Sequence, residues 1–247
     1  MNISIFTICY NEEIILQKFI DHYRTRFPNC EITIYDNMST DNSRQIAIKN
    51  GCKIIDYDSN NQIRDDLYLE IKNNCWKNAE TDWVLICDAD EFLDINEEDL
   101  IKEDNKKTTI ISAEGWNMIN TEDNPYLELK DIKWGSRAKQ YDKYYLFNKK
   151  YITEINYTAG CHFANPKGVK KMSDNIYKLY HFRALSEDYV VNKNIIFGKR
   201  LSKQNLKNNW GFHYLDSEET IRRNYKVYQD KANLKQVIDD NSNLFDN

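Results

Sequence analysis

A short apolar run that ends in acidic residues constrains the fold of this chain more than any other feature. The run covers residues 83–87, and Asp88, Asp90 and Glu91 follow it. Such a run is typical of a buried strand whose carboxyl end reaches the surface. Since side chains alternate along a strand, Asp88 and Asp90 are expected to point the same way, where two carboxylates repel each other unless a cation lies between them. Such oxygen ligands suit Mg²⁺ or Mn²⁺, which would in turn hold a diphosphate. The simpler interpretation is that the acids only end a strand and begin a helix.

Strand-like runs and helical patterns alternate in the first part of the chain. Strands are predicted at residues 3–9, 31–35, 53–57 and 83–87, and helices around residues 15–23, 45–50 and 63–79. This alternation predicts right-handed crossovers and a mostly parallel sheet in an α/β fold. Ligands bind at the carboxyl ends of the strands in such sheets. Polar clusters follow three of those ends, at residues 10–12, 36–41 and 88–91, so these loops are expected to form one site.

The second half of the chain has a less regular pattern. Strands are predicted at residues 108–113, 144–147, 161–163 and 179–182, with helical patterns after Arg183. A basic segment covers residues 193–207. A last helix is predicted from Asp216, with Glu219 as its capping-box partner, to about residue 238.

Composition limits the partners and the compartment that are expected. The 247 residues carry a formal net charge of −5, which argues against nucleic acid as a partner because phosphate binding depends on clustered Lys and Arg. The six cysteines include no C-x-x-C pair, and Cys9 and Cys87 fall in apolar runs, which favours reduced cysteines and a cytoplasmic location. The N-terminus lacks the pattern of a signal peptide, and no apolar run is long enough to cross a membrane, so no membrane span is expected.

Three motifs together resemble a known family. They are ICYNEE at residues 8–13, YDNMSTD at 35–41 and WVLICDADEF at 83–92. In order and spacing they are similar to the family-2-like glycosyltransferases with the GT-A fold, and most similar to the branch whose acid motif reads D-A-D-E-F. The resemblance covers about the first 95 residues. Later in the chain, His181-Phe182-Arg183 followed by Ser186 is similar to the H-Y-x-x-x-S pattern of related catalytic domains.

The resemblance implies an architecture. The fold class is expected to be α/β, with a GT-A (Rossmann-like) mostly parallel sheet, a mixed sheet on the acceptor side and C-terminal helices. The catalytic domain is expected to cover residues 1–182, with a nucleotide-binding half at residues 1–95 and an acceptor half at residues 96–182. Residues 183–247 are expected to form a helical extension packed on that domain.

The resemblance also assigns roles to individual residues. The nucleotide is expected to contact Tyr10, Asn11, Glu12, Asp36, Ser39, Arg64 and Asp88. Asp88 and Asp90 are expected to hold Mn²⁺ or Mg²⁺, with His181 as the third protein ligand. A buried core histidine is the alternative interpretation of His181, and His162 is a weaker candidate for the same ligand position.

These parts imply a metal-dependent glycosyltransferase that moves a sugar from a nucleotide-sugar donor, expected to be UDP-linked, to a hydroxyl of an unidentified glycan, lipid or protein acceptor. An inverting reaction is expected, and it needs a carboxylate base. The family spacing places that base at Asp188 or, alternatively, Glu187, and the same acids also suit the first turn of a helix. Glu114 and Asp142 are further candidates. The chain has no Q-x-x-R-W motif, so a processive polysaccharide synthase is not expected.

Three other functions compete with this interpretation. Phosphatases with an aspartyl nucleophile also use a D-x-D motif, but they place Thr or Val where Phe92 stands. A sugar nucleotidyltransferase also binds nucleotide and metal, yet the chain has no Gly-rich phosphate loop near its N-terminus. A non-catalytic carbohydrate-binding scaffold of the same fold would be indicated by loss of Asp88 or Asp90, and both are present.

Overall fold

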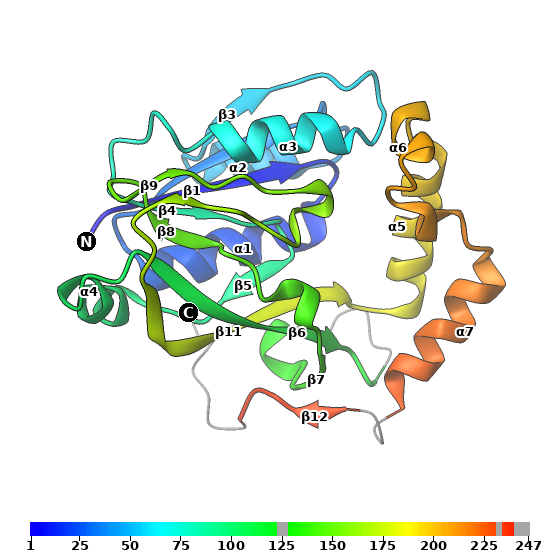
Figure 1. Ribbon diagram of the computed structural model, residues 1–247. Helices are drawn as coiled ribbons and strands as arrows, with labels where there is room; N and C mark the ends of the chain where they lie inside the picture. Colours follow the sequence, from blue (N-terminus) through cyan, green and yellow to red (C-terminus); the bar gives the residue numbers. More distant parts are fainter. Residues whose placement is uncertain (123–127, 231–233, 240–247) are drawn as a thin grey trace.

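The computed structural model describes residues 1–122, 128–230 and 234–239. Its centre is a 10-stranded sheet whose main path has the order β12-β7-β6-β8-β4-β1-β2-β3 (Figure 1). The N-terminal strands are β1 (Ile3–Cys9), β2 (Glu31–Asp36), β3 (Lys53–Asp56) and β4 (Trp83–Ile86). They pair in parallel, so the predicted parallel half of the sheet is confirmed.

Helices cover both faces of the parallel strands because β1 carries apolar side chains on both sides. α1 (Glu13–Arg26) and α2 (Ser43–Lys49) share one core with Ile5. On the opposite face, Phe6 belongs to a second core, against which Leu69 of α3 (Asp65–Asn74) packs. Each fully buried side chain of this size stabilises the fold by about 1.5–3 kcal/mol, so the two cores hold the strand ends in place.

α3 is shorter than the helix predicted at residues 63–79. Its last residue is Asn74, and backbone hydrogen bonds from Lys77 to Asn74 and from Ala79 to Trp76 then close tight turns. These turns bury Trp76, whose ring meets Phe147 edge-on with 5.0 Å between centroids. Packing of an aromatic side chain, and not helical periodicity, therefore determines where α3 ends.

The other half of the sheet is mixed, as predicted. Its strands are β5 (Glu91–Leu93), β6 (Ile110–Ile119), β7 (Trp134–Arg137), β8 (Leu146–Asn148), β11 (Met172–Ala184) and β12 (Lys235–Gln236). β8 runs antiparallel to β4, while β11 lies parallel to β6 and antiparallel to β5. A separate pair, β9 (Ile152–Glu154) and β10 (Lys167–Gly168), has no counterpart among the predicted strands.

The strand predicted at residues 161–163 is wrong. η3 (Ala159–Cys161) is a 3-10 turn in which Gly160 and Cys161 have positive φ angles of 72° and 54°. Successive left-handed residues cannot continue a strand, because strand geometry requires negative φ.

The last helix also differs from its prediction. α7 (Glu218–Gln229) is capped by Ser217, whose side chain accepts a hydrogen bond from the Thr220 N–H, so Asp216 is not its cap. It ends at Gln229, and β12 occupies part of the stretch that was predicted to be helical up to residue 238. Residues 231–233 of that stretch lie outside the described residues.

The C-terminal segment stands at one end of the sheet. It contains α5 (Glu187–Arg200), α6 (Lys203–Lys207) and η4 (Phe212–Leu215). In Figure 1, α5 and α6 face the end of the sheet to which the arrowheads of β1 and β11 point. The Ile63 N–H donates to the Arg200 carbonyl at 2.7 Å, and the Ser202 N–H donates to the Ile63 carbonyl at 3.3 Å. These bonds tie the C-terminal segment to the loop before α3.

Short helices occupy three of the remaining connections: α4 (Glu97–Asn105), η1 (Leu129–Asp131) and η2 (Lys139–Tyr141). In the three described ranges, no helix has the length and apolar character that crossing a membrane would require.

Candidate active site

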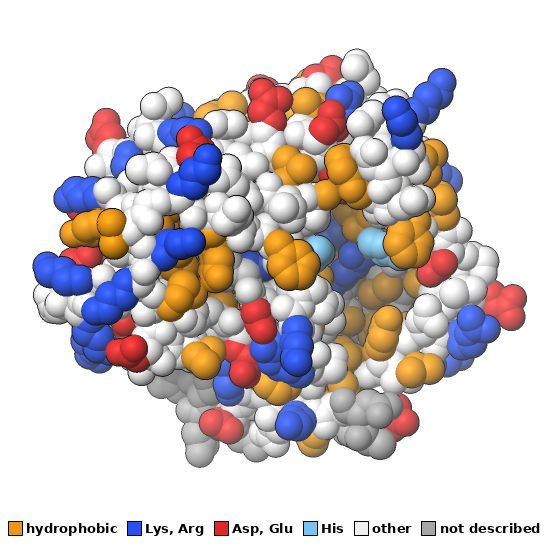
Figure 2. Space-filling model, in the orientation of Figure 1, with side chains coloured by type: hydrophobic (Ala, Val, Ile, Leu, Met, Phe, Trp, Pro, Cys, Tyr) orange, Lys and Arg blue, Asp and Glu red, His pale blue; other side chains and the backbone are white. Residues whose placement is uncertain are grey.

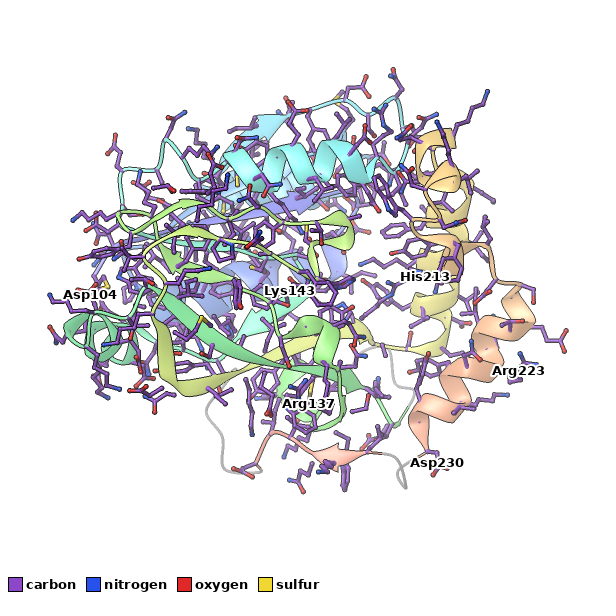
Figure 3. All side chains as sticks on the ribbon, viewed as in Figure 1. Asp104, Arg137, Lys143, His213, Arg223 and Asp230 are labelled. Carbon is purple, nitrogen blue, oxygen red and sulfur yellow. The ribbon has the colours of Figure 1, made fainter. Side chains whose placement is uncertain are left out.

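A cavity of about 420 Å³ lies where the loops after β1 and β4 face α5 and η4. Figure 2 shows a hollow on this side of the molecule, with Lys or Arg side chains at its floor and histidines beside it. Lys143 lies on the sheet side of the cavity and His213 on the helical side (Figure 3). The charged and polar side chains of its lining include Tyr10, Glu12, Asp65, Lys72, Asp88, Asp90, Tyr141, Lys143, His162, His181, Arg183, Lys193, Arg200 and His213.

The acidic residues after β4 form a tight turn, so the strand alternation from which Asp88 and Asp90 were expected to point the same way does not extend to them. The Asp88 N–H donates to Glu91 Oε2 at 2.9 Å, and the Glu91 N–H donates to the Asp88 carbonyl at 3.0 Å. Glu91 is 1% exposed and accepts hydrogen bonds from Lys143 Nζ at 2.6 Å and Tyr145 Oη at 3.2 Å. Glu91 therefore fixes the turn. Asp88 and Asp90 are the two acids of this turn that line the cavity.

Asp88 is paired with a lysine of α3. Its Oδ1 lies 2.6 Å from Lys72 Nζ, and its side chain is 42% exposed whereas that of Lys72 is 8% exposed. Burial alone would raise the pKa of Asp88, but attraction to Lys72 and Lys143 outweighs burial and lowers the pKa from its ordinary value. Asp88 is therefore an ionised carboxylate that the open cavity reaches.

Asp90 lies between a histidine and a lysine. Its Oδ2 is 3.6 Å from His181 Nε2 and 3.5 Å from Lys193 Nζ, and its side chain is 12% exposed. Burial alone would raise the pKa of Asp90, yet Lys193 and His181 hold the pKa well below its ordinary value. β11 supplies this histidine because its antiparallel register with β5 places His181 opposite Glu91.

The ring of His181 is held in its orientation by Asn117 and Tyr141. Its Nδ1 lies 2.8 Å from Asn117 Oδ1, which accepts a hydrogen bond, and Tyr141 packs on the ring at 4.2 Å between centroids. Because Asn117 Oδ1 can only accept a hydrogen bond, Nδ1 is the donor, and Nε2 is the nitrogen that points toward Asp90. This arrangement is typical of a metal-binding histidine, whose other nitrogen donates to a fixed acceptor.

Glu12 and Lys193 form a second charged pair beside Asp90. Lys193 Nζ lies 3.0 Å from Glu12 Oε2, so one ammonium group contacts both Glu12 and Asp90. Burial, together with the nearby negative charges of Asp90 and Asp88, raises the pKa of Glu12 to about 7 although Lys193 opposes this shift. Glu12 thus titrates near neutral pH, in contrast to the two aspartates.

The residues expected at the nucleotide fall into two groups. Tyr10, Glu12 and Asp88 line the cavity, whereas Asn11, Asp36, Ser39 and Arg64 are absent from its described lining. Tyr10 Oη donates to Asn61 Oδ1 at 3.2 Å, and the Arg200 guanidinium lies 3.1 Å from the centre of the Tyr10 ring. These two side chains form the wall of the cavity beside β1.

Three of the other four residues hold the loop after β2. Asn11 Oδ1 accepts from the Thr40 N–H at 2.8 Å, Ser39 Oγ accepts from the Asn11 N–H at 3.0 Å, and the buried Asp36 carboxylate accepts from the Ser39 N–H at 3.3 Å. Arg64 donates to both carboxylate oxygens of its neighbour Asp66, at 2.8 and 2.6 Å. None of these four side chains belongs to the described lining of the cavity.

Glu187 and Asp188, the expected carboxylate bases, are absent from the described lining of the cavity. Arg222 of α7 lies 3.1 Å from Glu187 and 3.0 Å from Asp188, and the Asp188 side chain is 78% exposed. Both acids occupy the first turn of α5, where they complement the helix dipole.

The two further candidates for the base are also engaged elsewhere. Glu114 accepts a hydrogen bond from Trp116 Nε1 at 2.8 Å, and Asp142 accepts one from the Gly115 N–H at 2.8 Å and pairs with Arg137 at 2.5 Å. Neither of them belongs to the described lining of the cavity.

Cations of the cavity were not predicted as a group. They are Lys72, Lys143, Arg183, Lys193 and Arg200, and they face the carboxylates Glu12, Asp65, Asp88 and Asp90. A sequence signal exists only for the last two, which fall in the basic segment at residues 193–207. The near balance of charge suits a ligand that brings both a divalent cation and an anionic diphosphate.

The donor groups suit a hard divalent ion that also binds a substrate phosphate. Within the described ranges, no group of three or more His, Cys, Asp or Glu side chains is arranged to enclose a metal by itself. Mg²⁺ and related ions commonly use one or two carboxylates and take their other ligands from phosphates and water. Asp90 Oδ2 and the oriented Nε2 of His181 offer two such donors, and the exposed carboxylate of Asp88 offers a third at the same turn.

Comparison with known proteins adds a sequence family and distant structural neighbours. The model of the family described as glycosyl transferase family 2 matches residues 4–171. Protein RfbJ of Shigella flexneri is 36% identical over 53 residues, which is 22% of this chain and 41% of RfbJ, so the chain spans less than half of that relative.

The neighbours among solved structures have low sequence identity. Residues 1–349 of S. aureus TarS, crystallised in complex with UDP, give a TM-score of 0.49 at 15% identity over 89% of this chain and 76% of that chain. Glucosyl-3-phosphoglycerate synthase from Mycobacterium tuberculosis, in complex with Mn²⁺, UDP and glucosyl-3-phosphoglycerate, gives 0.32 at 17% identity over 46% of this chain and 44% of that chain.

The family match includes β1, β2 and the acid turn, whose motifs carried the resemblance seen in the sequence. It covers well over half of the 247 residues, and the strands on which it begins form the observed parallel half of the sheet. The chain therefore belongs to glycosyl transferase family 2.

Proposed function

We propose that this protein transfers a sugar from a nucleotide-sugar donor, UDP-linked, to an acceptor hydroxyl, with inversion at the sugar carbon and with Mn²⁺ or Mg²⁺ as cofactor. The observation that carries the proposal is the convergence of Asp88, Asp90 and His181 on one cavity at the carboxyl end of a parallel sheet. Family membership supports glycosyl transfer, and the motifs of the first half support a nucleotide-sugar donor.

Each group of residues has a distinct task in this proposal. Asp88, Asp90 and His181 would hold the ion, which would supply positive charge to neutralise the departing diphosphate. Lys72 of α3 and Lys143 add positive charge to the same cavity. Tyr10 and Arg200 form the wall against which the nucleotide lies.

Release of UDP from a set of UDP-sugars tests the proposal. Purified protein is incubated with each donor and Mn²⁺, with and without EDTA, and UDP is quantified. We expect Mn²⁺-stimulated release with at least one donor. The Asp90→Asn variant is expected to release UDP about 100-fold more slowly or worse, because a carboxylate that holds the ion is lost.

Asp82→Asn provides the matched control for that variant. Asp82 lies near the start of β4, pairs with Lys150 at 2.5 Å and is outside the described lining of the cavity, so its variant should release UDP at the parental rate. Equal rates for Asp90→Asn and Asp82→Asn would contradict the metal assignment. Formation of a sugar nucleotide without transfer would favour a nucleotidyltransferase, and metal-independent UDP binding without turnover would favour a non-catalytic scaffold.

A further inference from the structure

A second cavity of about 390 Å³ adjoins the first one on the side of α7. Five residues line both: Tyr141, His162, His181, Arg183 and His213. The other walls of the second cavity come from β6, through Met118 and Ile119, and from α5 and α7, through Val190, Ile221 and Tyr225. A molecule in the second cavity would therefore meet a donor in the first one along this shared wall.

The shared wall carries no carboxylate. Within the described lining of the second cavity, the acidic side chain is Asp216, which is exposed and absent from the described lining of the first cavity. The proton acceptors common to both cavities are therefore histidines and Tyr141. His181 is already engaged, because its Nδ1 contacts Asn117 and its Nε2 faces Asp90.

His162 is held with one nitrogen available to a ligand. Its Nδ1 lies 3.1 Å from the backbone carbonyl of Gln140. A carbonyl oxygen can only accept a hydrogen bond, so Nδ1 carries the proton and the neutral ring keeps a lone pair on Nε2. The ring also meets Tyr141 edge-on at 5.6 Å between centroids, and Tyr141 in turn packs on His181.

The loop before His162 makes room for this ring. A Cβ atom on Gly160 would lie 2.9 Å from Cδ2 and 3.2 Å from Nε2 of His162, and Gly160 has a φ of +72°. The next residue, Cys161, is also left-handed, with a φ of 54°, although it is buried. Such unfavourable backbone conformations are kept where the surrounding structure fixes a side chain for function.

His213, the other histidine of the shared wall, has fewer constraints. It is exposed, and its ring nitrogens have no hydrogen bond to a described residue, although the ring packs on Tyr214 at 4.1 Å between centroids. Its tautomer is therefore not fixed by a carbonyl, in contrast to that of His162.

We propose that His162 Nε2 is the general base that removes the proton of the acceptor hydroxyl, a role that rests on the proposed glycosyl transfer. The acceptor oxygen forms a bond to the donor sugar carbon while the bond from that carbon to the diphosphate oxygen breaks. The acceptor proton passes to Nε2, and the electron pair of the broken bond leaves with the nucleoside diphosphate. The imidazolium then returns its proton to solvent.

The electrostatics of the wall support this role. Burial and then the nearby Lys143 lower the pKa of His162, while the Gln140 carbonyl, Glu91 and Asp88 oppose that shift. The ring is therefore neutral at pH 7 and able to accept a proton. Lys143 lies in the same cavity lining, so the charge that keeps the base neutral belongs to the site itself.

His162→Asn tests the base with the least disturbance. The Asn amide nitrogen can still donate to the Gln140 carbonyl, but no lone pair of a basic nitrogen remains. UDP release from a UDP-sugar, with water as the acceptor, is measured together with UDP affinity in the presence of Mn²⁺ by titration calorimetry. We expect release to slow about 100-fold or more and UDP affinity to stay within about twofold, since general bases contribute rates of this size. His162→Gln is measured as a second variant in case Asn destabilises the loop.

Added imidazole separates a catalytic role from a structural one. His162→Ala is expected to regain part of its UDP release as imidazole is added, because a free base can fill the vacated space.

Parental rates in both the Asn and Gln variants, or a loss of UDP affinity equal to the loss of rate, would overturn the assignment of His162. Loss of release in a His213→Asn variant but not in His162→Asn would transfer the role to His213. If the parent itself releases no UDP from any donor, the proposed glycosyl transfer fails as well, which distinguishes that failure from an error about the base alone.

Discussion

At the scale of single residues, Lys193 places its ammonium group beside Asp90, where the metal ion is expected to bind. Its ammonium group contacts Glu12 at 3.0 Å and Asp90 at 3.5 Å, and so competes with any metal that binds Asp90. We expect Lys193→Met to bind free Mn²⁺ about tenfold more tightly, because a competing charge is removed from a buried carboxylate. Titration calorimetry with MnCl₂ measures this. Lys199→Met, an exposed lysine on the same helix, should leave Mn²⁺ affinity unchanged, and weaker Mn²⁺ binding by Lys193→Met would show that the lysine organises the site instead.

Glu12 makes stability depend on pH. Its pKa in the folded protein is about 7, above the ordinary value of 4.5, so the folded state binds this proton more tightly than the unfolded state. The resulting stabilisation is complete below pH 4.5 and is lost as the pH rises through about 7. Relative to Glu12→Gln, the parent should therefore lose on the order of 3 kcal/mol of unfolding free energy across this range. Urea unfolding of both proteins at several pH values measures the difference, and a difference that does not change with pH would contradict the assignment.

Some site residues carried a local signal in the sequence, and others did not. Asp88 and Asp90 were predicted because an apolar run ends at them, and His181 because of the family pattern around it. Lys72 and Lys143 were not predicted, because single lysines have no periodicity and reach the cavity only through the packing of distant elements. The roles assigned to Asp88, Asp90 and His181 stay predictions until a metal is titrated.

At the scale of elements, η2 supports His162 and His181, two of the three histidines of the shared wall. Gly115 of β6 lies against it: a Cβ atom there would be 2.3 Å from Tyr141 Cβ and 2.7 Å from the Ala138 carbonyl. Gly115→Ala should therefore displace η2 and lower the unfolding free energy by about 1–3 kcal/mol, as overpacking does. Gly51→Ala is the comparison, since its Cβ would meet nothing within 4 Å and only its φ of +61° is unfavourable. Thermal unfolding of both variants measures this, and equal losses would show that η2 does not pack as described.

Asp188, in the first turn of α5, can be tested for a structural role against a catalytic one. Asp188 binds Arg222 of α7 and is largely exposed, so Asp188→Asn should keep UDP release within about twofold of the parental rate, as expected for a surface ion pair. A loss of about 100-fold would restore Asp188 as the base. Family spacing pointed to this position because the family places its base at a similar distance after the acid motif. It could not show that an arginine from a later helix binds the acid.

At the scale of the whole molecule, the two halves of the sheet differ in how well the sequence predicted them. The parallel strands follow from apolar runs and intervening helices, so β1 to β4 agree with their predicted ranges within a few residues. The mixed half depends on pairing between distant strands, as in the long register of β11 with β6, and on the left-handed loop before His162. Neither feature leaves a periodic pattern in the sequence. The predicted division of the chain at residue 182 stays untested, although α5, beyond that point, supplies Lys193 to the cavity.

The effect of Mn²⁺ on UDP affinity most directly tests whether the charged cavity binds a metal and a nucleotide together. Because five cations face four carboxylates, a divalent ion and a nucleoside diphosphate should each bind better in the presence of the other. UDP affinity is measured by titration calorimetry with Mn²⁺ and with EDTA, for the parent and for Asp90→Asn. The account predicts that Mn²⁺ strengthens UDP binding about tenfold or more in the parent and less than about twofold in Asp90→Asn. Equal UDP affinity in Mn²⁺ and EDTA for the parent would contradict it.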